Sequence, residues 1–531
     1  MPNLVAGILT ILFATLACLL SWQLFRRKHD RAAILMLALA GLALRLFTAS
    51  DLYLHEWDER YHALVAKNMI SHPLVPALYE EPALPYNYRD WTSNHVWLHK
   101  QPVPMWGMAA SMAIFGVNEI ALRLPSVLLT TLGIWLIFVI GSYFFDRKTG
   151  YLAAFFFAIN GLILELAAGR MPTDHIDIFF LFFTELAVFF TILFVKKRNP
   201  IFNILAGISI GLAILSKWLP ALIVLPVWLL LAIDTGKFSA RVIAGQFIML
   251  VAIATAVFLP WQIYIYRAFP LESAWESSLN FRHLTEVIEG QSGPVYYYLN
   301  KIRINYGELI YLPLLWFMYR LWRTPRELKY WALAAWFFIP FLFFSFVTTK
   351  MQGYLLFTSP VLFMLTAAFF RKLNEWKNRL RYPILVNLLL LVFLALPVRY
   401  AIERSKPFER RERNPEWVRE LRAQFKGQPA RLNDFSRSGG RAKFKVEELT
   451  ADREPPTANR ELRTLLFNYP RPVEAMFYTG MTVYKSIPDP ATIRELQGKG
   501  YEIMINDDGR LPEEIRGLEG VVYKTFPLPA H

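Results

Sequence analysis

Two neighbouring carboxylates, Asp58 and Glu59, lie in a short polar stretch that also holds His55 and His62. A second polar stretch, residues 94–102, adds two more histidines and a lysine. Carboxylate and imidazole groups are the side chains that most often take a proton in catalysis. A carboxylate pair with cations nearby is typical of a site that binds an anionic substrate and uses a general base. A solvated surface loop is the alternative interpretation of the carboxylate pair.

Further charged residues recur much later in the chain, each in a short polar segment beside long apolar runs. They are Arg170 and Asp174, then Lys217, then Arg282 and His283, and finally Thr349 and Lys350. Charges beside hydrocarbon are costly, so they are usually paired or functional. Taken alone, Lys217 is equally well explained as a lysine whose charged end reaches the membrane surface.

The four histidines His55, His62, His95 and His99 raise the possibility of zinc, but their spacing has no compact ligand pattern. We therefore expect no metal. The aromatic residues of the same region suit either a belt at the membrane interface or a platform for sugars. They are Trp57, Tyr61, Trp91, Trp97 and Trp106. No glycine-rich phosphate loop is present, which argues against a nucleotide-binding domain.

The elements that position these residues are apolar. Of 531 residues, 55% are hydrophobic and 19% are charged, and the apolar residues come in blocks long enough to cross about 30 Å of hydrocarbon. Continuous apolar runs indicate helices, because barrel strands alternate. The sequence therefore predicts an α-helical polytopic membrane protein with about twelve transmembrane helices. The expected spans are 4–25, 32–49, 124–145, 151–169, 175–195, 201–216, 218–233, 241–262, 307–322, 330–347, 353–370 and 383–401.

Basic residues follow every second span, at 26–28, 147–148, 196–198, 237–241, 320–329 and 371–381. Short basic connections face the cytoplasm, so the remaining connections are expected outside. These include the large loop 50–123 and the turns that hold Asp174, Lys217 and Lys350. The same distribution explains the net charge of +15, so we expect no nucleic-acid partner.

The chain is expected to divide into a membrane domain, 1–401, and a small soluble α/β domain, 402–531, on the outer face. In the second part, runs 473–478 and 501–505 look like strands and 490–497 like a helix. The apolar run 105–117 is short for a span and is predicted to lie along the outer surface. Cys18 has no partner for an internal disulfide, and the first 25 residues do not resemble a cleavable signal peptide.

The ordered series of motifs resembles the GT-C membrane glycosyltransferases, in the branch of the protein O-mannosyltransferases and the bacterial aminoarabinose (lipid A) transferases. Asp58-Glu59 matches the acidic pair of the first outer loop in that branch. The later matches, over about 45–400, are Lys100-Gln101-Pro102, Gly116, Arg123-Leu124-Pro125, Arg170 with Asp174, Gly-Leu-Ala-Ile-Leu-Ser-Lys at 211–217, Pro260-Trp261, and Thr349-Lys350 with Tyr354 and Pro360.

Two departures from the family pattern stand out. Gln101 replaces the first usual proline, and an extra stretch, residues 79–93, lengthens the interval between Asp58 and Lys100. That stretch bears on the shape of the acceptor site more than on the chemistry. Asp177 is a second candidate for the later acid, although the spacing favours Asp174.

The resemblance implies transfer of a sugar from a polyprenyl-phosphate carrier to an acceptor hydroxyl of a protein, a lipid or a glycan. It implies inversion at the sugar carbon, with Asp58 as general base and with Glu59 and Asp174 completing the catalytic group. Lys217, Arg282, Lys350 and Tyr354 are expected to bind the donor phosphate. Lys100, His55, His62, Arg170 and His283 are expected to contact acceptor or sugar. Protein cations make a cofactor unnecessary, so we expect metal-independent transfer at a bacterial inner membrane.

Two other classes of protein are alternative interpretations of the sequence. A transporter or flippase of lipid-linked sugars would place ionisable groups at mid-membrane, and Glu185 is such a group, although we expect it to make a polar contact between helices. A membrane scaffold without activity leaves the recurring polar segments unexplained.

Overall fold

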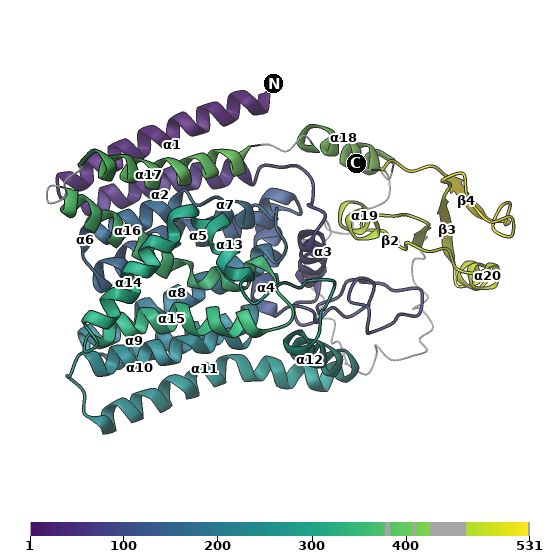
Figure 1. Cartoon of the computed structure of the whole chain (residues 1–531). Coiled ribbons are helices and arrows are strands. Elements are labelled where there is room, and N and C mark those ends of the chain that lie inside the picture. Colours follow the sequence, from purple (N-terminus) through teal and green to yellow (C-terminus); the bar gives the residue numbers. More distant parts are fainter. Residues whose placement is uncertain (1, 378–382, 407–409, 425–462, 529–531) are drawn as a thin grey trace.

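A bundle of long apolar helices is followed by a small parallel sheet in the computed structural model, which describes residues 2–377, 383–406, 410–424 and 463–528 (Figure 1). The helical part contains α1 (Pro2–Arg26), α2 (Asp30–Thr48), α3 (Asp58–Ser71), α4 (Pro102–Phe115), α5 (Glu119–Phe144), α6 (Arg147–Ala158), α7 (Gly161–Ala167), α8 (Asp174–Lys197), α9 (Pro200–Lys217), η1 (Leu219–Ile223), α10 (Val224–Asp234), α11 (Ala240–Ala268), α12 (Pro270–Thr285), α13 (Tyr297–Tyr306), η2 (Glu308–Ile310), α14 (Tyr311–Arg323), α15 (Leu328–Phe346), η3 (Gln352–Thr358), α16 (Ser359–Trp376) and α17 (Pro383–Ser405).

Each of the twelve expected spans coincides with helical structure. Within the described residues, nine helices are long and apolar enough to cross a membrane, or ten if the bent pair α6–α7 is one broken span. The bend between them is 53°, and the Asn160 side chain caps the second helix by accepting from the amide of Ile163. The other two expected spans, 218–233 and 307–322, fall on the shorter segments η1–α10 and η2–α14. The chain is thus a multi-pass membrane protein.

Polar contacts link the basic connections to one another at one end of the bundle. Arg147 donates to Asp30 at 2.5 Å, and Arg371 donates to Asp146. The amide of Lys329 donates to Asp234 at 3.1 Å. The opposite end carries α3, α4, α12 and the sheet (Figure 1). The sorting of connections into two ends is therefore confirmed, whereas the face of the membrane on which each end lies stays a prediction.

Two of the basic residues behind that prediction, Arg379 and Arg381, lie outside the described residues. The expected surface helix at 105–117 is α4, which begins at Pro102 and has 14 residues. It packs against α3, α5 and α9, and its last residues, Ile114 and Phe115, are exposed. Its position relative to the membrane surface stays a prediction.

The C-terminal part is built from α18 (Arg410–Gln424), β1 (Arg463–Phe467), α19 (Pro472–Thr479), β2 (Thr482–Val483), α20 (Pro490–Gly498), β3 (Tyr501–Asn506) and β4 (Val521–Lys524). All strand pairs are parallel, in the order β2-β1-β3-β4. The predicted strand at 501–505 and helix at 490–497 are confirmed. The predicted strand at 473–478 is wrong, because that run forms α19. Proline in the first turn and the helix formers Ala475 and Met476 favour a helix there.

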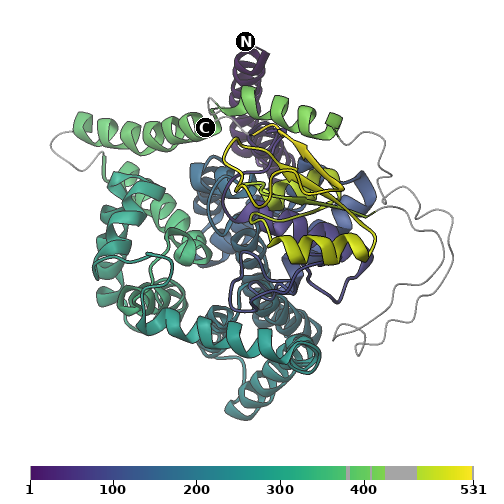
Figure 2. The same ribbon diagram turned by 90° about the vertical axis from the view of Figure 1, so that its right-hand side faces the viewer.

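The C-terminal part docks directly on α3. Lys67 of α3 is buried, and its ammonium donates to the carbonyls of Met476 and Phe477 at 2.8 and 2.9 Å, at the carboxyl end of α19. Arg60 pairs with Glu474 at 3.1 Å. Viewed from this end, the yellow C-terminal elements lie over the purple and blue segments of the first third of the chain (Figure 2). The docked surface therefore fixes the helix that begins at Asp58.

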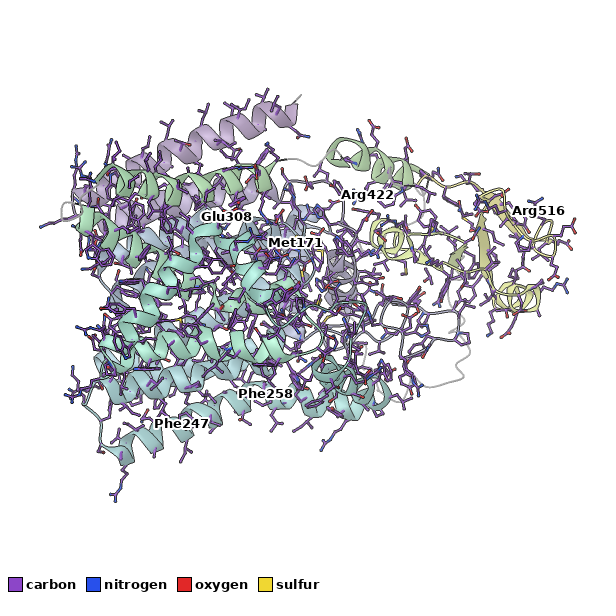
Figure 3. The ribbon with its side chains drawn as sticks, in the orientation of Figure 1. Met171, Phe247, Phe258, Glu308, Arg422 and Arg516 are labelled. Atoms are coloured by element: carbon purple, nitrogen blue, oxygen red, sulfur yellow. The ribbon has the colours of Figure 1, made fainter. Side chains whose placement is uncertain are left out.

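Side chains of the two parts differ in character. Phe247 and Phe258 lie on α11 within the apolar bundle. Arg422 and Arg516 lie in the polar C-terminal part, beyond the end of the bundle (Figure 3). The junction between the two parts is where the polar residues singled out by the sequence come together.

Candidate active site

Helix α3 begins at Asp58, so Asp58 and Glu59 are the first two residues of a helix. Consecutive residues of a helix point in directions about 100° apart. The two neighbouring carboxylates therefore enter two different sets of contacts. We call these the buried network and the accessible network.

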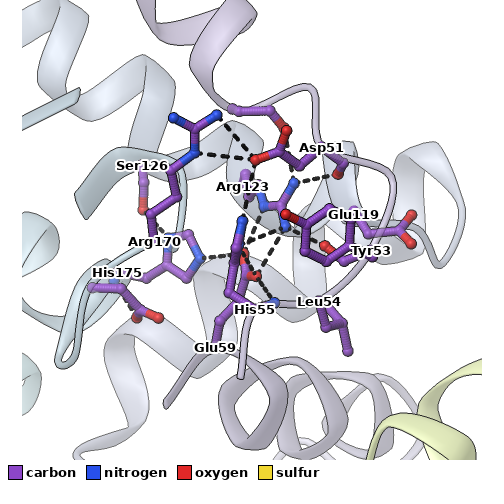
Figure 4. Close-up of polar contacts among 12 residues, drawn as sticks. Asp51, Tyr53, Leu54, His55, Glu59, Glu119, Arg123, Ser126, Arg170 and His175 are labelled. Carbon is purple, nitrogen blue, oxygen red and sulfur yellow. Dashed lines mark hydrogen bonds and ion pairs between the residues drawn. The ribbon is translucent and has the colours of Figure 1, made fainter. Parts of the chain in front are cut away.

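The buried network surrounds Glu59, whose side chain is fully buried (Figure 4). Arg123 donates to both carboxylate oxygens, from Nε at 2.6 Å and from Nη2 at 2.9 Å. The backbone amide of His55 donates to the same carboxylate at 2.7 Å. Arg123 also donates to the backbone carbonyls of Ala49 and Tyr53 at 2.9 and 2.7 Å. One arginine thus ties α3, α5 and the segment between α2 and α3 together.

The same network continues through Asp51, Arg170 and His175. Arg170 pairs with Asp51 at 3.0 Å, and the two ring nitrogens of His55 lie 3.2 Å from Asp51 and 2.8 Å from Glu59. Burial raises the pKa of Glu59, but Arg123 and His55 outweigh it and hold that pKa well below its usual range. Glu59 is therefore an ionised, fully paired anchor.

The lack of a side chain at one glycine provides the space that Glu59 occupies. Gly169 has a φ of +73°, and a Cβ built on it would lie 2.0 Å from Oε1 of Glu59. Any other residue would displace the carboxylate and strain the backbone. Three of the predicted site residues, His55, Glu59 and Arg170, thus belong to a buried assembly that holds the polypeptide in place.

The accessible network surrounds Asp58, whose side chain keeps 19% of its surface exposed. Its Oδ2 accepts from the amide of Thr173 at 3.1 Å and lies 3.9 Å from the ammonium of Lys100. The hydroxyl of Thr173 donates to Asp177, and so does the ammonium of Lys217. The two acid–base pairs, Asp58 with Lys100 and Asp177 with Lys217, are therefore joined through one threonine.

The backbone at Thr173 is unusual. Its φ of +64° lies in the left-handed region, which a β-branched residue adopts only under constraint. That conformation places its amide on Asp58 and its hydroxyl on Asp177. Gly353 approaches from η3, and a Cβ there would lie 2.3 Å from Oδ2 of Asp177. Tyr354 follows, with its ring centroid 5.2 Å from the ammonium of Lys217.

Several cations act on Asp58. Burial raises the pKa of its carboxyl, but Lys100, His62, His99 and the amide of Thr173 together lower it below the usual value of 3.8. Asp58 is thus a carboxylate at neutral pH, able to accept a proton when a hydroxyl is bound beside it.

Asp174, the later acid of the family pattern, has an unexpected role. Asp174 lies 2.8 Å from Nδ1 of His62, and both side chains are fully buried. Asp174 thus orients an imidazole one turn beyond Asp58 on α3, and Asp177 is the acid that holds the cation Lys217. Among the described residues, the partner of Asp174 is thus His62, and the expected part of Asp174 in the catalytic group stays a prediction.

The remaining predicted cations are arranged around a shared turn. The amide of Thr349 donates to the carbonyl of His283 at 3.1 Å, which joins the turn before η3 to the end of α12. Lys350 is buried, and its ammonium donates to the carbonyl of Val347. Arg282 is partly exposed and pairs at 2.7 Å with Glu286, which directly follows the end of α12. Within the described residues, neither cation contacts Asp58, Asp177 or Lys217.

Sequence reasoning missed Thr173, and it placed Asp177 second. A threonine directly before an acidic helix start is a cap signal, and it was the available clue to Thr173. It also missed the pairing of His99 with Glu276, 3.2 Å apart, because the two lie 177 positions apart. Arg123 was noted only as part of a motif, although a single arginine at the edge of an apolar run points to a buried partner.

In the described parts of the chain, no three histidine, cysteine or acidic side chains are grouped to hold a metal ion. Glu185 of α8 is fully buried against Gly133 of α5. Neither of its oxygens has a hydrogen-bond partner among the described residues, so the expected polar contact between helices is not formed.

This chain is similar to several known proteins. Residues 99–264 match the family model described as dolichyl-phosphate-mannose-protein mannosyltransferase. The chain is 25% identical over 288 residues to an undecaprenyl phosphate-alpha-4-amino-4-deoxy-L-arabinose arabinosyl transferase of Pseudomonas fluorescens, covering 50% of this chain and 48% of that protein. It is 26% identical to a protein of the same name from Pseudomonas aeruginosa, over 60% of each chain. The chain thus matches about half to three fifths of the length of these relatives.

Two solved structures share the fold. ArnT from Cupriavidus metallidurans, bound to undecaprenyl phosphate, superposes with a TM-score of 0.60 at 15% identity, over 90% of this chain and 93% of that one. The archaeal oligosaccharyltransferase AglB from Archaeoglobus fulgidus, in complex with an inhibitory peptide and a dolichol-phosphate, gives 0.56 at 14% identity, over 91% and 70%. The resemblance and the GT-C type of fold are confirmed.

Proposed function

We propose that this protein transfers a sugar from a polyprenyl-phosphate carrier to an acceptor hydroxyl, with inversion at the sugar carbon. The observation that carries the proposal is the accessible network. It offers an ionised carboxylate, Asp58, a few ångströms from Lys100 and linked through Thr173 to the Asp177–Lys217 pair. Proton acceptor and cations thus stand together at one end of a membrane bundle.

The reaction makes one bond and breaks one bond. The acceptor oxygen bonds to the anomeric carbon while the bond from that carbon to the phosphate oxygen breaks. The hydroxyl proton passes to Asp58, and the lipid phosphate leaves with the bonding electrons. Lys217 is placed to neutralise that phosphate by exchanging its contact with Asp177 for one with the phosphate oxygens. Lys350, Arg282 and Tyr354 are assigned to the same phosphate.

The supporting residues divide by what they touch. Lys100 stabilises ionised Asp58 and contacts the acceptor. His62, one turn further along α3, is fully buried and is assigned only to stabilising Asp58. Asp174 holds His62, and Glu59 holds α3 through Arg123, so we assign both acids a positioning role in place of direct catalysis. We assign His283 to the acceptor, at the turn that it shares with Thr349.

The proposal also concerns the surroundings of the site. The lipid tail of the donor lies in the bilayer, and the reacting phosphate lies at the bundle end that carries α3. We assign this end, with the C-terminal part, to the outer face of a bacterial plasma membrane. Relatives named for arabinose transfer from undecaprenyl phosphate, and a fold neighbour bound to undecaprenyl phosphate, support this class of donor. The acceptor is a hydroxyl of a protein, a lipid such as lipid A, or another envelope glycan.

Lysine and arginine side chains supply the neutralising charge in this scheme, so we propose transfer that needs no divalent metal. Chelation with EDTA is then expected to leave the initial rate unchanged. A loss of activity that a divalent ion restores would refute the metal-independent scheme.

The direct test is Asp58→Asn in purified protein supplied with polyprenyl-phosphate-linked sugar and an acceptor. The turnover rate is expected to fall by about 10²–10⁴-fold, because the amide cannot take the proton. Asp508→Asn, an exposed aspartate of the C-terminal part, is the matched control and keeps the wild-type rate. Wild-type turnover of Asp58→Asn would refute the assignment of the base. Movement of the lipid-linked sugar across vesicles without any transfer would favour the flippase.

A further inference from the structure

An aromatic ring stands exposed directly beside the proposed base. Trp57 is the residue before Asp58, and 59% of its surface is exposed. Within the described part of the chain, no other ring stacks on it and no side chain hydrogen-bonds it. Most large aromatic rings of the chain are packed into cores, so an uncovered indole one residue from a reactive carboxylate points to a ligand that covers it.

Three further rings contact one another between α3 and Lys100. Tyr61 lies one turn further along α3, and its ring meets Trp91 edge-on at 4.9 Å. Trp91 in turn stacks on His99, with centroids 4.5 Å apart and planes 7° apart. His99 directly precedes Lys100, whose ammonium lies 3.9 Å from Asp58. We call Trp57, Tyr61, Trp91 and His99 the aromatic strip.

The strip has a polar edge with spare hydrogen-bonding capacity. Nδ1 of His99 lies 3.2 Å from Oε2 of Glu276, on α12. The Glu276 side chain is only 7% exposed, and its other oxygen, Oε1, has no hydrogen-bond partner among the described residues. A buried carboxylate oxygen without a donor is costly. A ligand hydroxyl group that donates to Oε1 would remove that cost.

We infer that the aromatic strip and Glu276 form the acceptor subsite, and that the acceptor is a carbohydrate. A sugar ring has an apolar C–H face that covers an aromatic ring and hydroxyl groups at its edge that donate to carboxylates. Trp57 receives the face of the ring, and Glu276 receives a hydroxyl of the same or the next sugar. The reacting hydroxyl then lies beside Asp58. This inference rests on the proposed glycosyl transfer.

The location of the strip within the sequence supports a role in acceptor choice. Trp91 belongs to the stretch 79–93, by which the chain departs from the pattern it resembles. The chemistry-bearing residues Asp58, Lys100 and Lys217 all match that pattern. A segment added between Asp58 and Lys100 changes the residues next to the base and leaves the residues on the donor side unchanged.

A binding measurement tests the subsite without any turnover. Chitotetraose is added to the detergent-solubilised full chain carrying Asp58→Asn, and saturation-transfer NMR records which sugar protons receive magnetisation from the protein. We expect transfer to the C–H protons of one ring face. Adding Trp57→Ala should weaken binding about tenfold, as loss of one ring contact does. Glu276→Gln should weaken it by a smaller factor. Trp322→Ala removes a tryptophan that is 74% exposed on α14, and it should change nothing.

Each result decides the question. Chitotetraose binding that survives Trp57→Ala, or no carbohydrate signal at all, overturns the subsite. Signal from a serine- and threonine-containing peptide in place of the sugar overturns the carbohydrate assignment in favour of a protein acceptor. Because Trp57 is exposed, a melting temperature close to that of the parent protein confirms that its variant is folded. Sugar binding without transfer by the wild-type chain would retain the subsite and refute the proposed function.

Discussion

The buried network and the accessible network begin at adjacent residues of one helix and have opposite properties. Glu59 is fully buried, and both of its oxygens are held by Arg123. Asp58 keeps 19% of its surface exposed, and its nearest cation, Lys100, is 3.9 Å away. The first arrangement leaves no room for a substrate, whereas the second has capacity left to bind one. The comparison teaches that an acidic pair in sequence need not be a catalytic pair in space.

The largest expected effect is on the buried network. Arg123→Ala leaves Glu59 charged in the interior without its arginine, which should destabilise the fold by about 3–5 kcal/mol. Thermal unfolding in detergent measures the loss. In the matched variant, Arg123→Met together with Glu59→Leu, both charges are gone, and most of the stability should return. If Arg123→Ala melts like the wild type, the network is not the anchor we describe.

The next effect is on the accessible network. Lys217→Met should weaken binding of undecaprenyl phosphate by roughly 10–100-fold, since one charge-assisted hydrogen bond to the phosphate is lost. The titration is read from the ligand-induced rise in melting temperature. Lys217→Met with Asp177→Asn removes the whole pair and controls for the unpaired aspartate. Phosphate affinity should stay low in that double variant even where stability recovers, and recovered affinity would exclude Lys217 as the phosphate ligand.

The smallest effect, judged per pH unit, concerns Lys67, whose ammonium on α3 is buried like Glu59 but contacts carbonyls. Burial lowers the pKa of this lysine to about 8 in the folded chain, from 10.5. The unfolded chain then binds more protons between those two values, so stability should rise with pH across that window, by at most about 1.4 kcal/mol per pH unit. Melting temperatures from pH 7.5 to 10.5 follow this slope. Lys67→Met should lack it, and an equal slope in both proteins would contradict the contact.

Much of this arrangement is readable from the chain alone. The apolar blocks and the alternating basic connections predicted which segments meet at each end, since both follow from the cost of charge in hydrocarbon. Asp58, Lys100 and Lys217 were expected together and lie together. The predictions that failed depend on the direction in which a side chain points and on its local surroundings. Sequence does not tell which way Glu59 faces from α3, nor that Arg282 pairs with a residue just after its own helix. The apolar run at 473–478 fits a helix as well as a strand.

The contact between Lys67 and Met476 also has a consequence for biogenesis. Its two partners are 409 positions apart in the chain, and helices that cross the membrane lie between them. During synthesis, α3 is therefore made long before the surface that holds it exists, and contacts of such large sequence separation form late. The residues next to Asp58 then reach their final places only after the C-terminal part has emerged and docked. A truncated translation product would insert into the membrane but lack the contacts that hold α3 in place.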